Sequence, residues 1–129
     1  MLHETSPSIA KWSIGHGAIW GAVSKVRINE QGFGVAVEDM VFNAKKECTA
    51  LPESMEPRLL KSGRKGSLYV YDIECDQMIG NLVFFTQNHR DISIFALETN
   101  KKKEAEMDTV RTGLVDMLRD VMDSGTALD

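Results

Sequence analysis

The chain has 129 residues, of which 43% are hydrophobic and 26% are charged, and its formal net charge is -4. This length and composition are enough for a buried core, and they exclude a disordered or strongly basic protein. No stretch approaches the roughly 18 consecutive apolar residues of a membrane span, so no membrane partner is expected. We expect a single domain over residues 9–123, with short tails at residues 1–8 and 124–129.

The two cysteines, Cys48 and Cys75, carry no CxxC motif and no histidine at metal-ligand spacing. Their spacing therefore predicts neither a metal site nor a disulfide framework. Cys48 lies in a polar segment and is expected to be an accessible thiol, whereas Cys75 continues an apolar alternation and is expected in the core. Residues 1–8 lack the basic and apolar runs of a signal peptide. A reduced, cytoplasmic location is the resulting expectation.

The first third of the chain has the pattern of short strands. Apolar residues alternate with polar ones over residues 10–14 and again towards the end of residues 18–28, which predicts two strands. Residues 33–37 alternate in the same way, and residues 40–42 form a short apolar run. Together these segments predict an antiparallel meander.

The segment from Lys45 to Gly66 breaks this pattern, because it combines two prolines, two glycines and many charges. We expect a long connection there, with one helical turn near Pro57 to Lys61. A connection of this length in a compact domain is a place where function or a short element is found.

Three further strands are predicted at residues 68–75, 78–86 and 92–98. The last two are apolar on both faces and so require a covering layer. Residues 101–123 supply an amphipathic helix, which Thr99 or Asn100 can cap. Its apolar positions are Met107, Val110, Leu114, Met117, Leu118, Val121 and Met122.

These elements predict an α+β fold. It is an antiparallel sheet or small barrel of about five to seven strands, closed by one C-terminal amphipathic helix.

The chain contains none of the common catalytic or cofactor motifs, such as GxSxG, HExxH, GxxxxGK[ST] or GxGxxG. We therefore expect no cofactor, no metal and no enzymatic activity. An enzyme on an unrecognised scaffold is the third hypothesis, and it rests only on the polar residues His16, Asp72, Glu74 and His89.

The first hypothesis is a non-enzymatic protein-binding module of the inhibitor, immunity, adaptor or escort type. It follows from the small size, the acidic second half, and the methionine and aromatic side chains, which are adaptable and interface-prone. A homodimer through the C-terminal helix is a further option. The candidate contact residues are Trp12, Trp20, Tyr69, Tyr71, Met107, Met117 and Met122.

The second hypothesis is binding of single-stranded nucleic acid. Residues 21–23, 31–35 and 41–42 resemble the opening strands of a cold-shock domain, an OB-type barrel that stacks bases on aromatic side chains. The resemblance implies stacking on Phe33 and Phe42. It departs at Lys25 and Arg27, which stand where that family has aromatic residues, and the family is not assigned. Independently of the resemblance, cations flanked by glycines could hold a phosphate at Lys61, Arg64 and Lys65.

Overall fold

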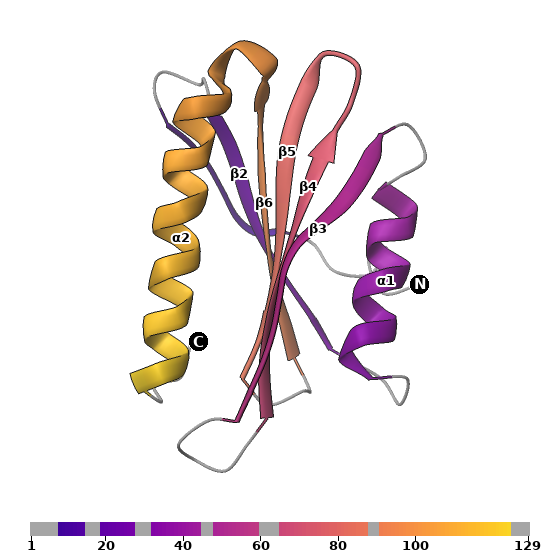
Figure 1. The fold of residues 1–129 in the computed structure, drawn as a ribbon, viewed down its shortest axis with the longest axis vertical. Helices are drawn as coiled ribbons and strands as arrows, with labels where there is room; N and C mark the ends of the chain where they lie inside the picture. Colours follow the sequence, from indigo (N-terminus) through magenta and orange to yellow (C-terminus); the bar gives the residue numbers. More distant parts are fainter. Residues whose placement is uncertain are drawn as a thin grey trace.

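The computed structural model describes residues 8–14, 19–27, 32–44, 48–59, 65–87 and 91–124. It contains a six-stranded sheet with a helix on each face (Figure 1). Neither helix of this described part has the length and apolarity needed to cross a membrane. The elements are β1 (Ser8–Ile14), β2 (Ile19–Arg27), α1 (Phe33–Ala44), β3 (Thr49–Leu59), β4 (Lys65–Glu74), β5 (Met78–Thr86), β6 (Asp91–Asn100) and α2 (Glu104–Ser124).

The strand order is β1-β2-β6-β5-β4-β3, and each neighbouring pair is antiparallel. The predicted α+β class, with an antiparallel sheet and a C-terminal helix, is confirmed. The sheet is open and not a barrel, because β1 and β3 form its two opposite edges.

The four central strands, β2, β6, β5 and β4, form where the sequence predicts strands. A row of side chains crosses all four on one face, because Val70 lies opposite Val83, Val83 opposite Phe95, and Phe95 opposite Val23. Such cross-strand apolar pairs are the main stabilising contacts of a sheet. This face packs against α2.

The C-terminal helix is also confirmed, with one correction to its buried face. A single 3-10 turn precedes it, and the Asn100 side chain caps this turn by accepting a hydrogen bond from the Lys102 amide at 3.0 Å. Met117, predicted on the apolar stripe, is 47% exposed. The fully buried positions are Met107, Val115, Leu118 and Met122, of which the predicted stripe lacks only Val115. The predicted Val110, Leu114 and Val121 are partly buried against the core.

The strands predicted at residues 33–37 and 40–42 are wrong, because both segments belong to helix α1. Phe33 and Val37 are four positions apart, so they also share one face of a helix. The apolar residues Met40 and Val41 continue that face by one further turn. Gly32 starts the helix with a φ of +88°, and its carbonyl accepts a hydrogen bond from the amide of Ala36 at 3.1 Å. Only glycine adopts this backbone conformation without strain. The buried side chains of α1 are Phe33, Ala36, Val37, Met40 and Val41.

Helix α1 is the second covering layer that the strands require. Strands β5 and β6 are apolar on both faces, and α2 covers only one of them. On the other face α1 packs over Tyr71, Phe84 and Ile92. The ring of Phe33 meets that of Tyr69 edge-on, with centroids 4.8 Å apart. The two helices therefore lie on opposite sides of the sheet (Figure 1).

The long connection predicted over residues 45–66 is wrong for its described part, which contains strand β3. The helical turn predicted near Pro57 is also wrong, because Pro57 lies within that strand. Proline is tolerated on an edge strand, where the missing N–H can face away from the ladder. The register shift between Pro52 and Ser54 and the charged residues are typical of a protected sheet edge.

Two arginines of α2 fasten this edge strand to the helix. Arg119 holds Glu56 through both carboxylate oxygens, with the Nη2–Oε2 distance at 2.5 Å and the Nε–Oε1 distance at 3.1 Å, and this contact raises the pKa of Arg119. Arg111 forms an ion pair with Glu53, elsewhere on β3, through Nη1 and Oε1. Burial raises the pKa of the Glu53 carboxyl, a hydrogen bond with Asp72 adds to the rise, and Arg111 opposes it. Helix α2 thus contacts the sheet from its central strands, β5 and β6, to the edge strand β3.

Candidate functional site

A disulfide joins Cys48 to Cys75 at the end of the β3–β4 pair. The prediction of an accessible thiol and a separate core cysteine is wrong. The two cysteines are 27 positions apart in sequence, but Thr49 lies directly opposite Glu74 in the ladder, so the residues just beyond that pair face each other. Only the pairing of β3 with β4, which the sequence did not indicate, brings the two sulfur atoms together.

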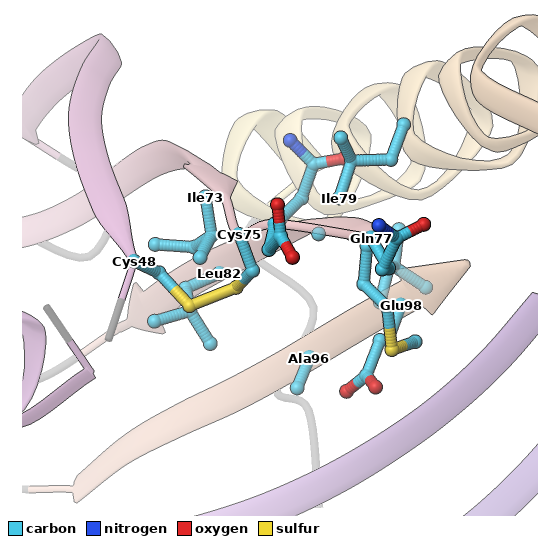
Figure 2. A pocket seen from close by; sticks show the side chains of 13 residues that line it. Cys48, Ile73, Cys75, Gln77, Ile79, Leu82, Ala96 and Glu98 are labelled. Carbon is cyan, nitrogen blue, oxygen red and sulfur yellow. A yellow bond between two sulfur atoms is a disulfide. The ribbon is translucent and has the colours of Figure 1, made fainter. Parts of the chain in front are cut away.

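A pocket of about 550 Å³ lies beside the disulfide, around the turn between β4 and β5 (Figure 2). Its volume falls within the range of about 300–1,000 Å³ that is usual for ligand sites. We call it the sheet-end pocket. Its lining residues are Cys48, Ile73, Cys75, Asp76, Gln77, Met78, Ile79, Gly80, Asn81, Leu82, Ala96, Leu97 and Glu98.

The floor of the sheet-end pocket is apolar and comes from three neighbouring strands. Three side chains of the floor point to the face of the sheet that α1 covers, and all three are half-buried: Ile73, Leu82 and Ala96. Ile73 and Leu82 also pack against the core beneath α1, so the pocket lies where that cover ends. Figure 2 shows the disulfide and Ala96 on one side of β5, with Ile79 directed to the other side, towards α2.

Small residues leave the hollow open. Ala96 lies between Leu82 of β5 and Ala22 of β2 in the register. Gly80 contributes no side chain, and a Cβ atom built on it would lie 2.7 Å from the carbonyl oxygen of Leu97. Close approach of the β5 and β6 backbones therefore requires glycine at this position.

The rim of the sheet-end pocket is acidic. Asp76 and Glu98 are exposed, and neither forms an ion pair with another residue in the described ranges. The adjacent lysine, Lys101, is paired with Glu74 at 3.8 Å between Nζ and Oε2. Because that cation already has its own partner, the negative charge of the rim remains available to a ligand.

Trp20 adds an aromatic side chain next to this rim. It is 59% exposed and lies directly opposite Glu98 in the β2–β6 ladder, two pairs beyond Ala22 and Ala96 and so on the same face of the sheet. Directly opposed side chains on one face have Cβ atoms about 5 Å apart. An exposed indole beside a carboxylate is a favourable place for a lysine or arginine side chain.

The other predicted protein-contact residues lie elsewhere in the fold. Tyr69 is half-buried near α1, and Tyr71 is buried, which raises its pKa. Met117 is exposed on α2, far along the chain from the pocket residues. Trp12 belongs to β1, but its side chain is outside the described residues. The other two methionines predicted as contact residues, Met107 and Met122, belong to α2 and are buried on its side facing the sheet.

Those predicted nucleic-acid residues whose side chains the structure describes are not brought onto one surface. Lys25 and Arg27 alternate with Val26 and so lie on the α2 side of the sheet, where Arg27 pairs with Asp91 at 3.5 Å. Phe33 and Phe42 both lie on α1, but Phe33 is buried in the core and Phe42 is 70% exposed. Of the basic loop, Lys61 and Arg64 lie outside the described residues, and so does the side chain of Lys65, which begins β4.

Of the polar residues considered for catalysis, the structure describes only Asp72 and Glu74. His16 and His89 lie outside the described ranges. Asp72 accepts a hydrogen bond from the Asn81 amide at 2.6 Å, and Glu74 pairs with Lys101. Within the described residues, no group of three or more His, Cys, Asp or Glu side chains is placed to hold a metal ion.

The residues of the sheet-end pocket that the sequence did not indicate are mainly small or apolar, such as Ala96 and Leu82. They are indistinguishable in the sequence from ordinary core residues, and only the end of the α1 cover exposes them. Compared with known proteins, the sequence matches no family model, and no curated protein is similar enough to be identified as a relative.

Proposed function

We propose that the protein is a non-enzymatic protein-binding module, and that its sheet-end pocket holds a segment of another protein. The segment carries an apolar side chain next to a lysine or arginine. The single observation that supports this proposal most is the combination of an apolar floor, at Ile73, Leu82 and Ala96, with an acidic rim at Asp76 and Glu98.

The two halves of the pocket have complementary roles in the proposal. Burial of one aliphatic side chain on the floor stabilises a complex by about 1.5–3 kcal/mol. A cation at the rim interacts with Glu98 and with the face of Trp20, and the aromatic contact contributes about 0.5–1 kcal/mol at an exposed site. Exposed tryptophan is also among the residue types that most often dominate binding energy at protein interfaces.

The proposal of a non-enzymatic role draws on the chemistry of the lining. The pocket offers two carboxyl groups, side-chain amides and a disulfide, and no histidine or free thiol lines it within the described part of the chain. Which kind of binding module it is, inhibitor, immunity protein, adaptor or escort, remains a prediction.

The cytoplasmic location also remains a prediction, and the Cys48–Cys75 disulfide bears on it. Stable disulfides belong mainly to oxidising compartments, and in the cytoplasm they are usually transient or redox-sensing. Acid-quenched alkylation of the protein from its native host measures the fraction of Cys48 and Cys75 that is oxidised in the cell. It therefore distinguishes a stable disulfide from a transient one.

A panel of labelled six-residue peptides tests the proposed function by fluorescence anisotropy. A peptide of alternating leucine and lysine is expected to bind, whereas the matched leucine–glutamate and serine–lysine peptides are expected to bind about tenfold more weakly or not at all. The reason is that each control removes one half of the recognition, the charge or the apolar anchor. A single-stranded oligonucleotide completes the panel, and its preferential binding would contradict the proposal.

Three variants then place the binding in the pocket. Ala96→Phe fills the floor, and Trp20→Ala removes the indole, so each is expected to weaken binding of the leucine–lysine peptide about tenfold. Glu98→Gln is expected to reduce the salt dependence of binding. The control is Met117→Ala, which changes an exposed methionine on α2 and is expected to leave the affinity unchanged. Circular dichroism confirms the fold of each variant, and equal affinity in all four folded proteins would overturn the assignment.

A further inference from the structure

We infer that the Cys48–Cys75 disulfide controls the sheet-end pocket, so that the oxidised protein binds its partner segment and the reduced protein releases it. This inference rests on the proposed function and adds its regulation. The disulfide is part of the pocket wall and, at the same time, the covalent tie between the start of β3 and the end of β4.

The position of the disulfide makes it accessible to a thiol reductant, and its reduction affects the wall of the pocket. Both cysteines are half-buried and line the pocket, so a thiol compound entering the pocket can reach their sulfur atoms. Cys48 comes directly before an edge strand, which has a paired neighbour on one side only. After reduction, the nearest β3–β4 ladder pair that holds the residues at Cys48 beside β4 is Thr49 with Glu74. The wall of the pocket next to Ile73 is then no longer fixed.

The reductant is a dithiol, and the exchange follows ordinary thiol–disulfide chemistry. One thiolate of the dithiol attacks a cysteine sulfur, which breaks the Cys48–Cys75 bond, forms a mixed disulfide and releases the other cysteine as a thiolate. The second thiolate of the reductant then attacks the mixed disulfide and releases the first cysteine. The protein gains two electrons and two protons, and the dithiol becomes a cyclic disulfide.

The charges around the disulfide select among reductants. Asp76 follows Cys75 in the chain and Glu98 lies across the pocket, whereas Glu74, which precedes Cys75, is paired with Lys101. Negative charge slows the approach of anionic thiols and speeds that of cationic ones. When each rate is divided by the rate of the same thiol with a small uncharged disulfide, cysteamine is expected to reduce the disulfide faster than 2-mercaptoethanol, and 2-mercaptoethanol faster than 2-mercaptoethanesulfonate. Added salt is expected to narrow these differences, because it screens the rim charges.

Peptide affinity measured in both redox states tests the inference. The leucine–lysine peptide is titrated into the oxidised protein, into the protein reduced with dithiothreitol, and into the Cys48→Ala/Cys75→Ala variant. The last two are expected to bind about tenfold more weakly than the first. Equal affinity in all three would overturn the redox control and leave the proposed function standing. Absence of binding to the oxidised protein would overturn both.

A reciprocal measurement keeps the test decisive if the reduced protein or the variant does not fold. A ligand that prefers the oxidised protein must make the disulfide harder to reduce, because binding and reduction are linked. At a fixed ratio of reduced to oxidised dithiothreitol, saturating leucine–lysine peptide is expected to lower the reduced fraction of protein, and the leucine–glutamate peptide is not. Identical reduced fractions with and without the leucine–lysine peptide would contradict the inference.

Discussion

Replacement of both Cys48 and Cys75 by serine is expected to lower the free energy of unfolding by about 3.5 kcal/mol. The disulfide closes a loop between residues 27 positions apart, which restricts the unfolded chain more than the folded one. In the folded protein the loop consists largely of two paired strands, so the substitution leaves the ladder itself in place. Urea unfolding of the oxidised protein and of the variant measures the difference.

The reduced wild-type protein is the matched control for this experiment, because it loses the same covalent bond without any substitution. Both proteins are expected to lose similar stability, and the denaturant midpoint is the most direct comparison. A loss below about 1 kcal/mol in both would mean that β3 is held by its ladder and by the arginines of α2 alone.

Replacement of Gly80 by alanine is expected to destabilise the protein by about 2–3 kcal/mol. The added Cβ atom would lie 2.7 Å from the carbonyl oxygen of Leu97, so the backbones of β5 and β6 must move apart. These two strands are at the centre of the sheet, where both helices pack. The free energy of unfolding in urea again measures the effect.

Gly113→Ala is the matched control, because it makes the same chemical change in the exposed middle of α2. Nothing lies within 4 Å of a Cβ atom built at Gly113, and alanine is the better helix former by about 1 kcal/mol. Gly113→Ala is therefore expected to stabilise the protein. The two substitutions should have opposite signs, and equal effects would show that the contact at Leu97 is unimportant.

The sequence predicts those elements whose side chains follow one period over their whole length. The alternation in β4 and the helical spacing in α2 are of this kind, and the apolar runs of β5 and β6 indicate strands buried on both faces. These four elements form as predicted. The double-sided burial of β5 also indicates a covering layer on each face, although only α2 was identified as one.

Helix α1 and strand β3 could not be predicted because their local signals favour other structures. The β-branched residues of α1, such as Val35 and Val37, favour strands in isolation, and packing against the sheet overrides that preference. Strand β3 contains Pro52 and Pro57, and only its position at the edge makes them acceptable.

The candidate site was predictable only in part. Trp20 was indicated by its residue type, and the structure places it opposite Glu98 with most of its surface exposed. The floor residue Ala96 gave no signal, because its significance comes from the point at which α1 stops covering the sheet. The sequence does not predict the disulfide, because the pairing of Cys48 with Cys75 depends on β3, and the local pattern of β3 indicates a connection and not a strand.

Nuclear magnetic resonance mapping of the bound leucine–lysine peptide tests the binding assignment most directly. Addition of the peptide to the oxidised, isotope-labelled protein is expected to shift the backbone amide signals of Gly80, Leu82, Ala96 and Glu98 and the indole signal of Trp20. The amides around Met117 on α2 are expected to stay unchanged. Shifts concentrated on the outer face of α1 or on α2, with the pocket amides unmoved, would contradict the assignment of the sheet-end pocket as the binding site.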